Sequence, residues 1–241
     1  MRFRQVAVWP RGLRIIHWIN AFSVLILIPL GAFLFFAEYL DLTDRAFGSV
    51  LNVHVTVGIV LTLGVVARVV FLFAGPPAAR WKDVLPHTRE QFALLSATLR
   101  YYLSGFKGKA PLYLTHNPVA GAWDTALFIV FLSQATTGLS MFFFHSAEHE
   151  HSHNHNHALE GAVAWPPEWF EGLHVAGAAF IIIFVLAHFT ALAWHDIFER
   201  RGLVSSMISG RKFYSEEEIQ ELKARLERKG LKPEGNGTKK T

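Results

Sequence analysis

Four long apolar runs constrain the fold of this chain more than any other feature. They cover residues 15–37, 50–74, 120–144 and 172–194. Each run is long enough to cross a hydrocarbon core about 30 Å thick as an α-helix, which takes roughly 20 residues. Helices satisfy their own backbone hydrogen bonds, as spanning segments must where lipid offers no partners. The sequence therefore predicts an all-α fold, an integral membrane bundle of four transmembrane helices.

The composition agrees with a small membrane protein. Of the 241 residues 51% are hydrophobic, and the mean hydropathy is positive. No small-residue cleavage site follows the first run, so we expect a membrane span rather than a cleaved signal peptide. The chain contains no cysteine, which excludes disulfides, iron–sulfur clusters and covalently attached c-type haem. The net charge of +4 comes from basic residues beside the spans, so no nucleic-acid partner is expected.

The basic residues divide unequally between the connections. Most Lys and Arg residues lie in the N-terminus, in the 75–119 connection and after residue 195, whereas the 38–49 loop has only Arg45 and the 145–171 loop has none. Short loops rich in Lys and Arg stay in the cytoplasm. We therefore expect a multi-pass protein of the bacterial inner membrane, with both termini cytoplasmic and the 38–49 and 145–171 loops periplasmic.

Segments outside the spans carry their own signals. Residues 86–104 are amphipathic and predict a cytoplasmic surface helix. Ser215 and Glu218 form a capping-box pattern that predicts a charged helix over residues 215–229. The last ten residues have the composition of a disordered segment. We expect a transmembrane domain over residues 1–200 and a cytoplasmic helical and disordered tail over residues 201–241.

Histidines occur at two depths within the apolar runs. His174 and His188 are 14 residues apart, which is roughly 21 Å of helix and close to four turns, so both imidazoles lie on one face. His17 and His54 lie in the first and second runs at matching depths. With the orientation above, His54 and His174 fall in the periplasmic half and His17 and His188 in the cytoplasmic half.

A histidine inside the membrane is costly unless it has a partner, which makes it a candidate functional residue. A lone one can be a helix–helix hydrogen bond. Four at two depths instead predict two haem b groups, each held by two imidazoles. A haem with two axial His ligands has no open coordination position, so it carries electrons rather than binding substrate. Glycines in the spans would admit either a haem or a neighbouring helix: Gly31, Gly58, Gly138 and Gly177.

Other polar residues of the spans have two interpretations each. Arg68 either pairs with a haem propionate or reaches the membrane interface. Asn117 precedes Pro118, which predicts a helix N-terminus whose amide would suit a quinone carbonyl. His116 or Asp124 could then relay protons, although Asp124 is also explained as an interfacial charge. The third run offers hydroxyls and an amide for a haem edge or for the backbone one turn earlier: Ser133, Gln134, Thr136 and Thr137.

Several motifs together resemble a known family. They are R-x-x-H-W from Arg14 to Trp18, the H-x-x-x-G of His54 and Gly58, the segment HNPVAG, the segment QATTG, and His174 with His188. Over residues 9–200 the chain resembles the bacterial di-haem cytochrome b subunits, which are the membrane subunits of nickel-iron hydrogenases and the gamma subunits of formate dehydrogenases.

The resemblance implies an electron-transfer subunit of a quinone-linked respiratory oxidoreductase. In that family a periplasmic partner exchanges electrons with the haem nearer the periplasm, and a quinone reacts near the cytoplasmic haem. By resemblance, His54 and His174 hold the first haem, His17 and His188 hold the second, and Asn117 matches a quinone-site position. The partner would be a hydrogenase, a formate dehydrogenase or a cytochrome c type of protein, and the quinone a menaquinone or ubiquinone. The sequence leaves the direction of electron flow open.

The chain departs from the family at SAEHEHSHNHNH, residues 146–157. Its clustered histidines could bind nickel, zinc or copper, or act only as an incidental chelator: His149, His151, His153, His155 and His157. They suggest an alternative function, a metal-ion transporter with this loop as its collecting arm. A transporter is expected to place polar ligands near the midplane, where this chain is aliphatic. Electron transfer is therefore the favoured interpretation.

Overall fold

The computed structural model of the chain describes residues 3–108, 111–113, 116–151, 169–199 and 202–228. The contacts divide the chain into two compact units. Unit 1 contains Met1–Arg11, Gly75–Ala122 and Leu192–Thr241, and unit 2 contains Gly12–Ala74 and Trp123–Ala191. The His-rich run beyond residue 151 and the last residues of the tail lie outside the described residues. The predicted domain boundary at residue 200 stays a prediction, and the contacts group the tail with the N-terminal segment and the central connection.

Four helices of the described chain are long and apolar enough to cross a membrane: Arg11–Phe35, Asp44–Ala74, Pro118–Phe144 and Trp169–Ile197. They correspond to α1 (Arg11–Phe35), α2 (Asp44–Ala74), α5 (Pro118–His151) and α6 (Trp169–Trp194). The predicted membrane helix bundle is confirmed. The helices begin a few residues before the apolar runs, because capping residues are polar. At the start of α2, for example, the Thr43 hydroxyl accepts a hydrogen bond from the amide of Ala46 (3.3 Å).

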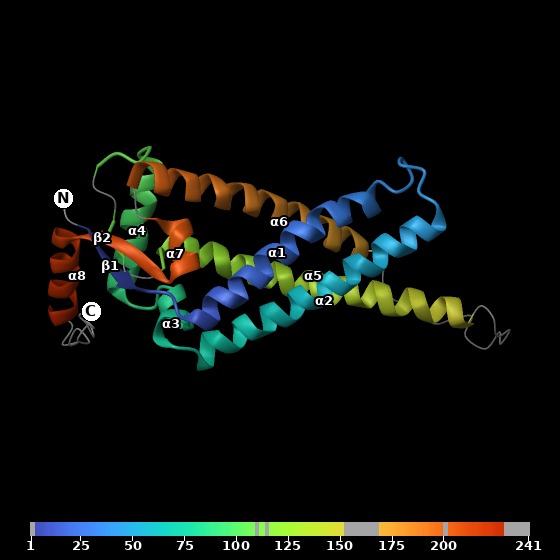
Figure 1. Ribbon diagram of the computed structural model, residues 1–241, viewed down its shortest axis with the longest axis horizontal. Coiled ribbons are helices and arrows are strands. Elements are labelled where there is room, and N and C mark those ends of the chain that lie inside the picture. Colours follow the sequence, from blue (N-terminus) through green and yellow to red (C-terminus); the bar gives the residue numbers. More distant parts are fainter. Residues whose placement is uncertain (1–2, 109–110, 114–115, 152–168, 200–201, 229–241) are drawn as a thin grey trace. The chain divides into compact units, whose positions relative to one another are not determined.

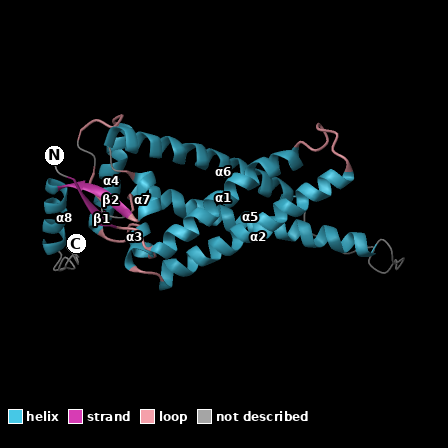
Figure 2. Ribbon diagram, viewed as in Figure 1, coloured by secondary structure: helices cyan, strands magenta, loops and turns pink. Residues whose placement is uncertain are grey.

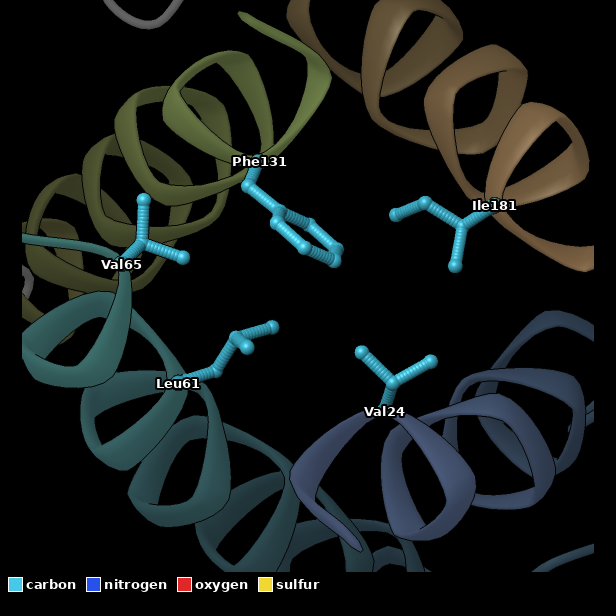
Figure 3. Packing of buried hydrophobic residues seen from close by; sticks show 5 residues of the cluster. All are labelled: Val24, Leu61, Val65, Phe131 and Ile181. Carbon is cyan, nitrogen blue, oxygen red and sulfur yellow. The ribbon is translucent and has the colours of Figure 1, made fainter. Parts of the chain in front are cut away.

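In unit 2 the four long helices run alongside one another (Figure 1). Their buried apolar side chains point from each helix toward a common centre, as Figure 3 shows. These are Val24 of α1, Leu61 and Val65 of α2, Phe131 of α5 and Ile181 of α6. Every helix of unit 2 thus contributes to one aliphatic and aromatic core.

Unit 1 contains the short elements: β1 (Phe3–Ala7), η1 (Pro77–Ala79), α3 (Trp81–Val84), α4 (Arg89–Leu103), the π-helix η2 (His195–Glu199), α7 (Leu203–Ser209), β2 (Arg211–Ser215) and α8 (Glu216–Arg228). The predicted helix at 86–104 forms as α4, which starts at a capping box between Thr88 and Gln91. The helix predicted over 215–229 forms as α8. The Ser215 hydroxyl accepts from the Glu218 amide (3.2 Å), and the Glu218 carboxylate accepts from the Ser215 amide (2.9 Å).

The sequence did not predict the small sheet of unit 1. Strands β1 and β2 pair antiparallel, in the register Phe3↔Ser215 to Ala7↔Arg211 (Figure 2). An isolated two-stranded sheet is marginal in water. Here Tyr214 packs in a buried cluster with Val8 and Leu112. The sheet therefore ties the N-terminal segment to the tail and to the central connection between α2 and α5.

Candidate functional site

The four histidines of the spans lie at seven-residue spacings from core residues of unit 2. Seven residues make nearly two helical turns and about 10 Å of rise, so residues seven apart share a face. His17 lies seven residues before Val24 on α1, and His54 lies seven before Leu61 on α2. On α6, Ile181 lies midway between His174 and His188. The histidines therefore lie on the core-facing sides of their helices, at two levels separated by the apolar cluster.

We call His54 and His174 the first level. Their ring centroids are 6.3 Å apart, at an interplanar angle of 62°. A metal–imidazole bond is about 2 Å long, and the ring centre lies roughly 1 Å beyond the nitrogen, so two imidazoles on opposite sides of one metal have centroids roughly 6 Å apart. The spacing of the first level fits two axial ligands of one iron.

Helix α5 holds the ring of His174 by a hydrogen bond that fixes its tautomer. The Thr137 hydroxyl donates its proton to the carbonyl oxygen of Ser133 (2.8 Å) and lies 2.9 Å from Nδ1 of His174. A hydroxyl has one proton, so its oxygen accepts from Nδ1–H of the imidazole. The lone pair is then on Nε2, which is the arrangement a metal ligand needs. Gln134 adds a second tie, because its side-chain amide donates to the carbonyl oxygen of His174 (2.8 Å).

The ring of His54 has a different environment. Nδ1 of His54 is buried and has no hydrogen-bond partner among the described residues. Glycines flank both rings. A Cβ on Gly138 would lie 3.0 Å from Cε1 of His174, and a Cβ on Gly31 would lie 3.4 Å from Cε1 of His54. The two close approaches show that both glycines leave room for the imidazole rings, and the buried nitrogen of His54 is compatible with a group held by both imidazoles.

We call His17 and His188 the second level. They lie seven residues from Val24 on α1 and from Ile181 on α6, so both share the core-facing sides of their helices. The ring of His188 stacks on Phe184, with centroids 5.9 Å apart and planes at 12°. The ring of His17 meets Trp18 edge-on at 5.5 Å. Aromatic rings thus restrict the rotation of both imidazoles.

Charged residues accompany the second level. Arg68 lies seven residues after Leu61, so it shares the core-facing side of α2, and it is only 7% exposed. Its guanidinium lies 5.5 Å from the ring centre of Phe128 on α5. Asp124 lies seven residues before Phe131 on the same helix. Of the two interpretations of Arg68, the structure supports an inward guanidinium that can meet an acidic group of a cofactor.

Asn117 lies in unit 1, at the start of α5. Its side-chain oxygen accepts from the amide of Val119 (2.9 Å), so Asn117 caps the helix whose first residue is Pro118, as predicted. Its side-chain nitrogen donates to the hydroxyls of Tyr102 (2.5 Å) and Tyr113 (3.4 Å). Neither tyrosine is predicted from the sequence, because a contact between residues on separate segments leaves no local pattern.

Two further histidines of unit 1 have defined partners. His195 could compete with His188 as a ligand by sequence, seven residues further on, but its Nε2 lies 3.4 Å from the hydroxyl of Tyr102. His116, a candidate proton relay, pairs through Nδ1 with the carboxylate of Asp83 (2.6 Å). These contacts support His188 as the histidine of the second level.

The hydroxyls of the third run bond the backbone one turn earlier, as one of the two interpretations holds: Thr136 donates to the carbonyl oxygen of Leu132 and Thr137 to that of Ser133 (2.8 Å each). Thr137 and Gln134 also contact His174. A contact with a haem edge stays a prediction. Within the part of the chain that the structure describes, no group of three or more His, Cys, Asp or Glu side chains could hold a metal ion. The side chains from His149 to His157 lie outside it.

Comparisons with known proteins identify the family. Residues 8–210 match the family described as prokaryotic cytochrome b561. A probable Ni/Fe-hydrogenase B-type cytochrome subunit of Bradyrhizobium diazoefficiens is 28% identical over 216 residues, covering 85% of each chain. Proteins of the same description from Rhodobacter capsulatus and Cupriavidus necator are 26% and 25% identical, covering 91% and 84% of this chain and 86% and 85% of their own. No solved structure was found to match.

The matched region contains all four membrane helices and the histidines at both levels. It covers well over half of the chain, which establishes the family. The chain therefore belongs to the prokaryotic cytochrome b561 family: it is a helical, membrane-embedded b-type cytochrome that carries haem b and takes part in electron transfer.

Proposed function

We propose that this protein is a di-haem electron-transfer subunit that connects a periplasmic hydrogenase to the quinone pool of the bacterial inner membrane. The observation that carries the proposal is the arrangement of two histidine pairs on the core-facing sides of three helices, with an apolar cluster between them. His54 and His174 would hold one haem b, and His17 and His188 the other. Each haem supplies an iron that takes up and releases one electron.

The side chains around each level have separate tasks. Thr137 and Gln134 orient the ring of His174, and Gly138 and Gly31 keep the space beside the imidazoles free of a Cβ. The apolar cluster of unit 2 excludes water between the levels, which keeps the local dielectric low. Arg68 offers a buried positive charge to a propionate of the second group, since a carboxylate buried without a partner is costly.

The orientation rests on the basic residues. The three Lys- and Arg-rich segments all contribute to unit 1. With these segments in the cytoplasm, the first level lies in the periplasmic half of the membrane. Curated relatives are described as cytochrome subunits of Ni/Fe-hydrogenases, which favours a hydrogenase as the periplasmic electron donor. Electrons would then cross most of the membrane, and each charge moved against 100 mV costs about 2.3 kcal/mol.

The quinone site is proposed at Asn117, in unit 1. Oxidation of the dithionite-reduced protein by a soluble quinone analogue, followed by stopped-flow absorbance, tests this function. We expect rapid reoxidation in the natural protein and much slower reoxidation in Asn117→Leu, with both haem spectra retained because no iron ligand changes. The matched control is Asn52→Leu, the same substitution at an exposed position on α2. A natural protein that the quinone analogue does not reoxidise would contradict the quinone link.

The hydrogenase link needs its own measurement. In membranes that contain the protein and its hydrogenase, hydrogen gas should reduce the b-type absorbance without added mediator. His54→Ala should abolish that reduction while leaving hydrogenase activity toward a soluble dye unchanged. Reduction of the b-type absorbance by another donor but never by hydrogen would reassign the partner.

A further inference from the structure

We propose that the hydroxyl of Tyr102, rather than the amide of Asn117, contacts the quinone carbonyl, and that His195 supplies its proton. This inference rests on the proposed quinone function and names the residues that perform it. All of these residues belong to unit 1. Asn117 then acts as a positioning residue, which holds the tyrosine hydroxyl in place.

The hydrogen bonds of Asn117 are already used by the protein. Its oxygen caps α5 at the amide of Val119, which fixes the orientation of the side-chain amide. An amide nitrogen has two protons to donate. One is donated to Tyr102 at 2.5 Å and the other to Tyr113 at 3.4 Å. A quinone bound directly by Asn117 would have to displace one tyrosine, and the hydrogen bond to that tyrosine would be lost.

The hydroxyl of Tyr102 contacts both Asn117 and His195. The side-chain nitrogen of Asn117 donates to the phenol oxygen, and Nε2 of His195 lies 3.4 Å from the same oxygen. When Nε2 carries no proton it accepts from the phenol hydroxyl, and when it carries one, Nε2–H donates to the phenol oxygen. The pair thus delivers a proton in one protonation state and receives it in the other.

Aromatic rings cluster beside the ring of Tyr102. The ring of Phe106 lies 5.3 Å from that of Tyr102 and 4.4 Å from that of Trp194, between centroids. Phe106 has a φ of 63°, a left-handed conformation that bulky residues rarely adopt. Surrounding contacts must maintain such strain, which is typical of functional sites. A flat apolar ring with polar edges, as in a quinone headgroup, suits aromatic walls that carry a hydroxyl.

The position of His195 is also fixed locally. It is 6% exposed and begins the π-helix η2, an irregularity that occurs often at functional sites. Asp196 holds this turn, because its carboxylate accepts from the amide of Leu203 (2.6 Å) at the start of α7.

Reduction of a quinone to a quinol takes two electrons and two protons, and the two haem b groups of the protein would supply one electron each. At one carbonyl, the O–H bond of Tyr102 breaks as the quinol O–H bond forms. The N–H bond of protonated His195 then breaks to restore the tyrosine, and water reprotonates the imidazole. The second carbonyl takes its proton from water.

Two conservative variants test the inference in the full-length, haem-loaded protein. Tyr102→Phe removes only the hydroxyl, and His195→Gln keeps a hydrogen-bonding side chain that cannot release a proton. With a soluble quinone analogue as the probe, we expect His195→Gln to lower the limiting rate of haem reoxidation by about 10²-fold, typical of losing a general acid. Its half-saturating quinone concentration should change little. Tyr102→Phe should lower the limiting rate and also weaken equilibrium binding of the analogue.

Tyr101→Phe is the matched control, because Tyr101 also contacts the ring of Phe106. It should keep the natural rate and binding. If Asn117→Leu is slow while Tyr102→Phe and His195→Gln react at the natural rate, the amide binds quinone directly, so this inference is wrong and the proposed function stands. If the natural protein is not reoxidised at all, both are wrong. Should Tyr102→Phe lose its haems, the limiting rate of His195→Gln decides alone.

Discussion

At the residue scale, the hydrogen bond between Thr137 and His174 is the most specific interaction of the first level. Thr137 combines two contacts in one hydroxyl: it donates to its own helix and accepts from the imidazole. Groups that orient a metal-ligating histidine in this way typically affect metal affinity by 10–100-fold.

Thr137→Val should weaken one haem without removing it. The variant keeps the shape of the side chain but leaves Nδ1–H of His174 without its acceptor. We expect haem loss to an excess of apomyoglobin to be about tenfold or more faster for that haem. Thr136→Val is the control, because the Thr136 hydroxyl bonds only one turn back along its own helix among the contacts described. Equal rates of haem loss in both variants would exclude an orienting role for Thr137.

The candidate haem ligands could be identified from the sequence, but the side chains that contact them could not. A histidine in an apolar run is visible without a structure, because its cost in lipid requires a reason. The link from Thr137 to His174 joins residues 37 apart, and the link from Tyr102 to His195 joins residues 93 apart. Contacts of this kind depend on how helices pack, and no local pattern encodes them.

At the element scale, core-facing residues recur every seven positions along each helix of unit 2. They are His17, Val24 and Gly31 on α1; His54, Leu61 and Arg68 on α2; Asp124, Phe131 and Gly138 on α5; and His174, Ile181 and His188 on α6. A strict seven-residue repeat keeps one face of a helix toward its neighbours. The small residues of the repeat lie opposite the rings, since Gly31 faces His54 and Gly138 faces His174.

The seven-residue spacing, which defines the two levels, predicts which substitutions act on the same haem. His54→Ala and His174→Ala should each remove one haem, and His17→Ala and His188→Ala should each remove the other, because a two-histidine site does not survive the loss of a ligand. Redox titration of the remaining b-type absorbance distinguishes the two haems by their potentials. His195→Ala should retain both haems. If His54→Ala and His174→Ala left haems of different potential, the pairing by level would be wrong.

The four helices themselves were predictable from the sequence, whereas the sheet of unit 1 was not. Runs of 20 or more apolar residues leave few alternatives to a membrane helix. Strands β1 and β2 are five residues each and lie more than 200 residues apart. Neither has a strong alternating pattern, and the packing of Tyr214 with Val8 and Leu112 that stabilises the pair cannot be read from either strand alone.

At the scale of the whole molecule, the division of basic residues predicts the orientation of the protein in its membrane. The chain has no natural cysteine, so single cysteines can report on each side without background. In intact cells whose outer membrane has been permeabilised, a membrane-impermeant maleimide should label Arg45→Cys but not Lys223→Cys. Both positions are exposed in the structure. The reverse labelling would invert the orientation and move the first level to the cytoplasmic half.

The central claim is that one chain holds two haem b groups between four histidines. Pyridine haemochrome analysis of the purified natural protein, against a protein concentration from amino-acid analysis, measures the ratio directly. We expect a ratio near two in the natural protein, with all haem extracted by acidified acetone because no cysteine can attach it. The ratio should be near one in His174→Ala and near zero in the double variant His174→Ala, His188→Ala. A ratio near one in the natural protein, or an unchanged ratio in His174→Ala, would contradict it.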